Sequence, residues 1–131
     1  IDSRAGQFPA LVPAGVETIH ADDPADEVAD LPGSCFAVVM THRHDMDRAI
    51  VEKLLRRNDF AYVGVIGSAT KRARFVHHLA RRGIPAEAVA RLRCPIGIAG
   101  ITSKQPRDIA IAVAAELLLV RDTAPNERAA S

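Results

Sequence analysis

Apolar residues gather in short runs along the chain, separated by longer amphipathic stretches. The runs that suit β-strands cover residues 16–20, 36–40 and 61–66. The second reads Phe-Ala-Val-Val-Met and the third Ala-Tyr-Val-Gly-Val-Ile, and neither alternates between apolar and polar residues. Continuous apolar runs are typical of strands with both faces covered, so the pattern predicts a parallel sheet.

Helical patterns lie between and after these runs. They cover residues 45–57, 69–82, 85–92 and 106–120. In the first helix Met46, Ile50 and Leu54 recur every four residues, which predicts one face turned toward the core. The last helix begins with Pro106 and is apolar or small on nearly every side, so we expect it to be well buried.

Strands that alternate with helices predict right-handed βαβ crossovers. The fold class is therefore α/β, a Rossmann-like domain with a doubly wound, mainly parallel sheet and helices on both faces. We expect this domain to cover residues 1–122 and residues 123–131 to form a flexible tail. Ligands of such folds bind beyond the carboxyl ends of the strands. The segments to inspect are 2–4, 41–45, 67–72 and 95–104.

The segment around Gly67-Ser68 joins a strand to a helix. A glycine there lets a ligand approach the backbone, and free N–H groups at the helix start favour an anion. Lys71, Arg72 and Arg74 follow in the first turns, where cations oppose the helix dipole unless an anion or an acidic partner compensates them. One interpretation is an anion site in which Lys71→Ala and Ser68→Ala weaken binding and barely change stability. The other is a tight turn capped by Ser68.

Two further loops carry candidate binding residues. His42 and Arg43 follow a strand directly and are expected to border the ligand cleft. Their segment approaches the His-x-His-x-Asp-His pattern of binuclear zinc hydrolases, but the spacing fails, and we expect no metal site. Gly97, Ser103 and Lys104 lie in a loop before the last helix, which either lines the ligand or only turns the chain.

Two single residues have weaker assignments. Cys94 follows Arg93 and either packs in the core or forms a thiolate. Asp2 occupies the place of a ribose-binding acid at the tip of a second Rossmann strand. The matching Gly-x-Gly-x-x-Gly would precede Ile1, so we interpret the chain as part of a longer protein. Without that first strand, we expect a hydrophobic sheet edge that self-associates or accepts a partner strand.

Composition narrows the class of protein. The chain has 131 residues and a net charge of +1, so no global field favours nucleic acid. No apolar run approaches the length of a membrane span. The two cysteines, Cys35 and Cys94, are too few for a disulfide scaffold and suggest a reducing, cytoplasmic compartment.

Together these segments resemble the XdhC/CoxI family of accessory proteins over residues 1–120. The resemblance is carried by Val39-Met-Thr-His-Arg-His44, Phe60-Ala-Tyr-Val-Gly-Val-Ile-Gly-Ser68 with Lys71, Arg72 and Phe75, Cys94-Pro-Ile-Gly97, Gly100, Ser103-Lys104, Pro106, Ile109-Ala110 and Ala114-Ala-Glu-Leu117.

The resemblance implies a cytoplasmic maturation factor, not a dehydrogenase. Such a protein binds the molybdenum cofactor (molybdopterin, a phosphorylated pterin) and delivers it, after sulfuration by a cysteine desulfurase, to a xanthine dehydrogenase-type molybdenum hydroxylase. We also expect a homo-oligomer and no catalytic residues. The alternatives are an NAD(P)-dependent oxidoreductase and a nucleotide-sensing regulatory domain of the same fold. The candidate cofactor-binding residues are Asp2, His42, Arg43, Gly67, Ser68, Lys71, Arg72, Gly97, Ser103 and Lys104.

Overall fold

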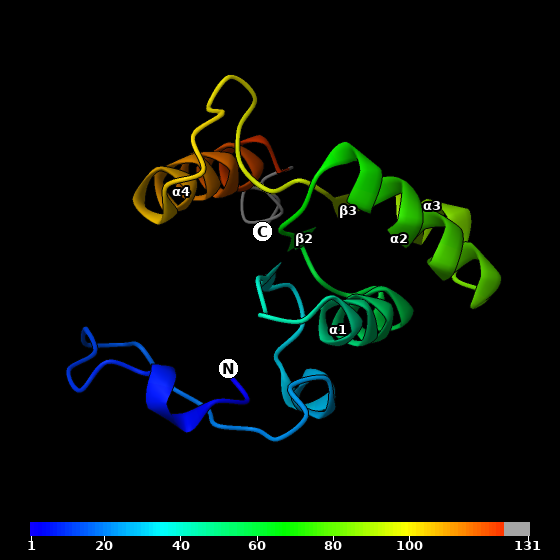
Figure 1. Cartoon of the computed structure of the whole chain (residues 1–131). Coiled ribbons are helices and arrows are strands. Elements are labelled where there is room, and N and C mark those ends of the chain that lie inside the picture. Colours follow the sequence, from blue (N-terminus) through cyan, green and yellow to red (C-terminus); the bar gives the residue numbers. More distant parts are fainter. Residues whose placement is uncertain (125–131) are drawn as a thin grey trace, which may run out of the picture.

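A three-stranded parallel sheet lies at the centre of the molecule (Figure 1). The computed structural model describes residues 1–124. The strands are β1 (Phe36–Val39), β2 (Tyr62–Val65) and β3 (Leu92–Arg93), in the order β1-β2-β3. Phe36 pairs with Tyr62, and Val63 pairs with Leu92. All three strands therefore present their carboxyl ends at one edge.

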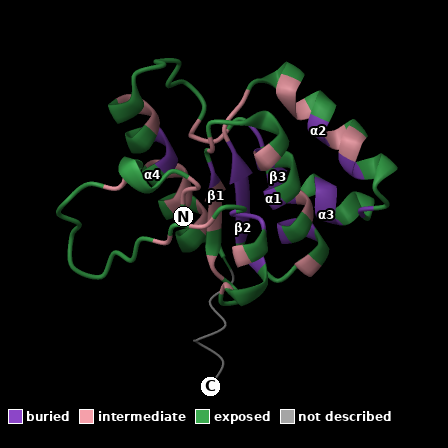
Figure 2. Ribbon diagram, turned by 60° about the horizontal axis from the view of Figure 1, so that its bottom comes forward, coloured by how far each residue is buried: buried purple, intermediate pink, exposed green. Residues whose placement is uncertain are grey.

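Helices cover both faces of this sheet. Helices α1, α2 and α3 lie on one face and α4 on the other, as Figures 1 and 2 show. This arrangement confirms the predicted doubly wound α/β fold. The helices are α1 (His44–Arg57), α2 (Ala69–Arg81), α3 (Ala86–Ala90) and α4 (Pro106–Thr123), with short 3-10 turns η1 (Ala5–Gln7) and η2 (Asp26–Asp30).

The core lies between the sheet and the helices of the first face. The predicted stripe of α1 is present, because Ile50 and Leu54 are buried and Met46 packs against them. On α2, Phe75 and Leu79 are buried. Helix α1 ends at Asn58, whose left-handed conformation (φ 53°) lets its backbone N–H bond to the carbonyl of Leu54.

The predicted strand over residues 16–20 is wrong. In its place a single parallel bridge joins Asp2 to His20, with the Asp2 N–H donating to the Ile19 carbonyl at 3.0 Å. A strand needs a ladder partner along its length, and within residues 1–124 Asp2 forms only two backbone hydrogen bonds here, one with Ile19 of the run and one with Ala21 beyond it. An apolar run alone therefore did not produce a strand here.

Strand β3 was missed. The sequence predicts a helix over 85–92, whereas α3 ends at Ala90. Leu92 and Arg93 instead form a strand that pairs with β2. The guanidinium of Arg91 bonds to the Asn58 side chain at 2.7 Å and to the Phe60 carbonyl, which fixes the chain at the start of this strand. Two residues are too few to show a strand pattern.

The expected deep burial of the last helix is also wrong. Only Ala112 and Val113 of α4 are buried, and Ile111, Leu118 and Leu119 are at least half exposed. The helix is apolar on most sides but meets the rest of the described chain along one narrow face. Its remaining apolar surface therefore faces solvent.

The carboxyl end of the described chain is helical. Helix α4 continues to Thr123, past the expected domain end at residue 122. The expected tail, apart from its first two residues, lies outside the described residues. Among the helices of residues 1–124, none is long and apolar enough to cross a membrane.

Candidate functional site

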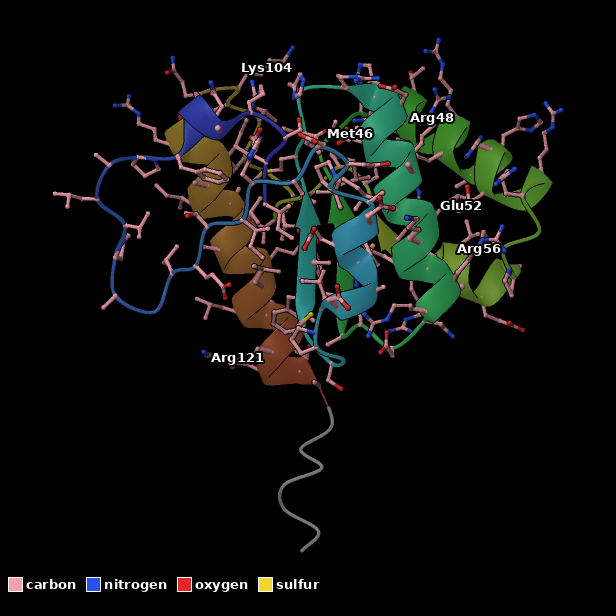
Figure 3. The ribbon with its side chains drawn as sticks, turned by 90° about the horizontal axis from the view of Figure 1, so that it is seen from below. Met46, Arg48, Glu52, Arg56, Lys104 and Arg121 are labelled. Carbon is pink, nitrogen blue, oxygen red and sulfur yellow. The ribbon has the colours of Figure 1, made fainter. Side chains whose placement is uncertain are left out.

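The candidate residues come from four segments near the carboxyl edge of the sheet. Figure 3 shows Lys104 at the end of the molecule toward which β1 points, on the same side as the start of α1 at Met46. Arg121, near the end of α4, lies at the opposite side. The fold thus directs the predicted loops to one edge, as expected for a doubly wound sheet.

A buried ion pair between Asp47 and Lys71 lies directly beneath this edge. The Lys71 Nζ atom donates to Asp47 Oδ2 at 2.9 Å and to the Ile66 carbonyl at 2.6 Å. The other carboxylate oxygen of Asp47 accepts from the backbone N–H of Thr41 at 3.0 Å and lies 2.7 Å from its hydroxyl. The pair therefore ties α1 and α2 to the ends of β1 and β2.

This pair changes the interpretation of the basic cluster at the start of α2. The side chains of Asp47 and Lys71 are 1% and 14% exposed, so the charge of Lys71 is already compensated inside the protein. Arg72 donates to the Leu92 carbonyl at 2.7 Å. The assumption that the cations of α2 are uncompensated is therefore wrong for Lys71. We expect Lys71→Ala to lower stability, because the buried Asp47 carboxylate would lose its partner.

The roles of Gly67 and Ser68 are also structural. A Cβ atom at residue 67 would lie 2.6 Å from Lys71 Cδ and 3.0 Å from Cys94 Sγ. The glycine thus leaves room for the side chains of Lys71 and Cys94. Ser68 is the N-cap of α2, and its hydroxyl accepts from the Lys71 N–H at 3.2 Å. Capping of this type contributes about 1 kcal/mol, so Ser68→Ala is also expected to lower stability.

The sequence analysis did not single out Asp47, which lies in the first turn of α1. A signal for its burial was present in the sequence. Asp47 precedes Ile50 and Val51 by three and four residues, which places it on the apolar face of α1. A carboxylate on a buried face needs a partner, and Lys71 is that partner.

Asp2 and His42 lie together at one end of a groove beside β1. Both oxygens of Asp2 bond to the Arg4 guanidinium, at 3.1 Å each. This hydrogen bonding lowers the pKa of Asp2 to about 2. His42 is exposed, and its charge makes a smaller contribution to lowering the pKa of Asp2. Arg43, also exposed, pairs with Asp45.

A second cluster joins Gly97 to α4. One oxygen of Glu116 accepts from the Tyr62 hydroxyl at 2.8 Å and from the Gly97 N–H at 2.6 Å. Burial, and then the neighbouring carboxylate, raises the pKa of Tyr62. Gly97 has a positive φ of 99°, which favours glycine at this turn. The sequence analysis gave Glu116 no role, because its partners are distant in sequence.

Ser103 and Lys104 precede α4 on an exposed loop. The Ser103 hydroxyl lies 2.5 Å from Asp108 and accepts from the Gln105 N–H, so it organises the start of α4. Lys104 is exposed and extends at the carboxyl edge (Figure 3). The predicted residues thus form separate groups and do not line one shared pocket among the described residues.

Cys94 packs and has no feature of a reactive thiol. Its side chain is buried, and burial raises the pKa of the thiol despite the nearby charges of Lys71 and Arg72. In residues 1–124, no three His, Cys, Asp or Glu side chains lie close enough together to hold a metal ion.

Comparison with known proteins identifies the family. The sequence profile of the XdhC Rossmann domain matches residues 2–117. The chain belongs to the XdhC Rossmann-domain family. The family named by the sequence resemblance is therefore confirmed.

Two relatives place this XdhC Rossmann domain among longer proteins. An uncharacterized protein of Escherichia coli, YqeB, is 33% identical over 125 residues, which are 94% of this chain and 22% of that protein. A crystal structure described as a xanthine dehydrogenase from Bacillus halodurans superposes with a TM-score of 0.66 at 28% identity. That match covers 82% of this chain and 30% of the other.

Proposed function

We propose that this domain binds the molybdenum cofactor, a phosphorylated pterin, and helps to deliver it to a xanthine dehydrogenase-type molybdenum hydroxylase. The observation that carries the proposal is membership of the XdhC family over residues 2–117. The Bacillus neighbour, described as a xanthine dehydrogenase, supports a link to that class of enzyme. A cysteine desulfurase, a second copy of the protein and a cytoplasmic location belong to the same proposal.

The donor chemistry at the carboxyl edge suits a phosphate group. His42, Arg43 and Lys104 are exposed there, and charged donors form the stronger hydrogen bonds to phosphate. Lys71 is committed to Asp47, so we propose His42 and Lys104, which lie on separate loops of this edge, as the phosphate donors. Arg43 and Ser103 adjoin them in sequence and are engaged by Asp45 and Asp108. Gly67, Ser68, Arg72 and Gly97 shape the loops beneath this edge.

A binding role fits these residues better than a catalytic one. Catalysis by a nucleophile needs an activated group beside a base. Cys94 has a raised pKa, and Asp47 and Lys71 are engaged with each other and with backbone groups. These features argue against nucleophilic catalysis by either group, so we propose a binding role for the domain.

The alternative functions are an NAD(P)-dependent oxidoreductase and a nucleotide-sensing domain. The observation favouring them is the place of Asp2 beside the sheet, where dinucleotide folds bind ribose. However, the carboxylate of Asp2 is bonded by Arg4 through both oxygens, and it would have to release Arg4 to accept ribose hydroxyls.

Calorimetry on the full-length natural protein tests the proposal. We expect saturable binding of molybdopterin and at least about tenfold weaker binding of NADH and ATP, a difference of about 1.4 kcal/mol. Tighter binding of NADH or ATP than of molybdopterin would favour the alternatives. No binding of molybdopterin by the full-length protein would contradict the proposed function.

A further inference from the structure

A line of cations runs along the outward side of helix α2. Arg74, His77 and Arg81 are exposed and follow one another at intervals of three and four residues, so they lie on one face of the helix. Helix α2 contains no acidic residue. Among the described residues 1–124, none of these three side chains forms an ion pair. The positive charge on this face is therefore left without a partner inside the domain.

Glu52, the acid at the surface between α1 and α2, is already occupied. Its side chain is only 13% exposed, and it pairs with Arg56 at 2.9 Å and with Arg82 at 3.1 Å. His78 Nε2 lies 3.6 Å from the same carboxylate. Figure 3 shows Arg48, Glu52 and Arg56 in one row along the side of α1 next to α2. One carboxylate thus serves several basic groups and leaves the line of cations on α2 uncompensated.

Charge is divided between two sides of the molecule. Residues 69–93 contain seven Lys or Arg residues and one acid, whereas residues 22–30 contain five acids and no Lys or Arg. Figures 1 and 3 show α1 between this acidic stretch and α2. Opposite charges nearly cancel over the whole chain, which has a net charge of +1. The attraction for an anionic partner is therefore local to the face of α2.

A shallow groove of about 520 Å³ follows the same helix. It is lined by six residues of α2: Ala69, Arg72, Ala73, Val76, His77 and Ala80. These positions recur every three or four residues, so the groove extends over about three turns. Alanine and valine form its floor, and the helical spacing places Arg72 and His77 on opposite sides of that floor. The groove thus has an apolar centre with a basic side chain on each side.

We infer that this groove and its line of cations dock an acidic α-helix of a partner protein. The small side chains of the floor let a second helix axis approach to about 8–10 Å, the usual distance between packed helices. Carboxylates spaced three and four residues apart on that helix then meet Arg74, His77 and Arg81. This surface is separate from the residues proposed above to hold phosphate, so the inference stands whichever ligand the domain binds.

A protein helix suits this face better than nucleic acid does. Surfaces that bind single-stranded nucleic acid add exposed aromatic rings on which the bases stack, and the aromatic residue of α2, Phe75, is buried. A long polyanion is also repelled by the acidic stretch 22–30 on the other side of α1. A short acidic helix avoids that repulsion because it covers one side of the domain only.

Fluorescence anisotropy with the full-length natural protein tests the inference. The probe is a fluorescein-labelled Glu/Ala peptide of about 14 residues, which forms about four helical turns, with Glu at intervals of three and four. We expect saturable binding that weakens as salt is added. The double variant Arg74→Glu/Arg81→Glu should bind the peptide at least about tenfold more weakly, because like charges then face each other.

The matched control is Arg107→Glu/Arg121→Glu on α4, which changes the net charge by the same amount. Both residues are largely exposed, at 83% and 62%, and lie outside the groove, so this variant should keep the affinity of the unchanged protein. Circular dichroism melts verify that both double variants fold. Equal affinity of the two double variants for the peptide would overturn the inference, because net charge alone would then govern binding.

Two further probes test the nature of the partner. A peptide with two central alanines replaced by proline cannot form the helix, and we expect it to bind at least about fivefold more weakly. Equal binding of the two peptides would overturn the helical partner. The second probe is duplex DNA, and tighter binding of DNA than of the helical peptide would assign the face to nucleic acid and overturn the inference. Absence of saturable peptide binding would overturn it as well.

Discussion

Replacing Lys71 by methionine is expected to lower the free energy of unfolding by about 3–5 kcal/mol, the usual cost of leaving one partner of a buried ion pair uncompensated. The carboxylate of Asp47 is 1% exposed and would lose the bond from Lys71 Nζ. Denaturant unfolding followed by circular dichroism measures the change. The control is Arg74→Met, which removes an exposed cation from the same helix and should change stability by about 0.5 kcal/mol or less.

A double-mutant cycle separates the pair from its surroundings. Combining Asp47→Leu with Lys71→Met removes both charges. The double variant should therefore lose less stability than the sum of the losses of the two single variants. Equal stability of Lys71→Met and Arg74→Met would contradict the buried pair. It would also restore the interpretation of Lys71 as a free cation at the ligand edge.

Replacing Glu116 by alanine is expected to cost about 2–3 kcal/mol, because a buried donor left without a partner costs about 1–3 kcal/mol. Glu116 accepts from the Tyr62 hydroxyl and from the Gly97 N–H, and Tyr62 is only 4% exposed. Its loss should loosen the contact between α4 and the loop after β3. Thermal unfolding and hydrogen exchange at Gly97 measure the two effects.

Asp122→Ala on the same helix is the matched control. Its ion pair with Arg121 is exposed, so the change should stay within about 0.5 kcal/mol. Tyr62→Phe removes one donor and leaves the other bond, so it should cost less than Glu116→Ala. If Glu116→Ala behaves like Asp122→Ala, the shared carboxylate does not hold α4 to the sheet.

The helices and strands with a regular spacing of apolar residues were predictable from the sequence. Helix α1 and helix α2 lie within a residue of their predicted bounds, and β1 and β2 within one residue at each end. Their apolar spacing reflects burial on a face, which is a local property of the sequence. The direction of the parallel strands then placed the candidate loops at one edge.

The parts that depend on distant partners were not predictable. Asp47 and Lys71 are 24 residues apart, and Tyr62 and Glu116 are 54 apart, so no local pattern joins them. Strand β3 exists because it pairs with β2, and residues 16–20 lack such a ladder. An anion site was one of two interpretations of the basic cluster of α2, because Asp47, which pairs with Lys71, lies on another helix.

Titration of the full-length protein with molybdopterin, using variants at the carboxyl edge, is the most direct test of the proposed binding function. We expect the double variant His42→Ala/Lys104→Ala to bind at least about tenfold more weakly, since each charge-assisted bond contributes about 1.5–3 kcal/mol. The control His77→Ala/Arg81→Ala removes an exposed histidine and an exposed cation from the far half of α2 and should leave affinity unchanged. Equal affinity of the two double variants would contradict the assignment of the phosphate donors to this edge.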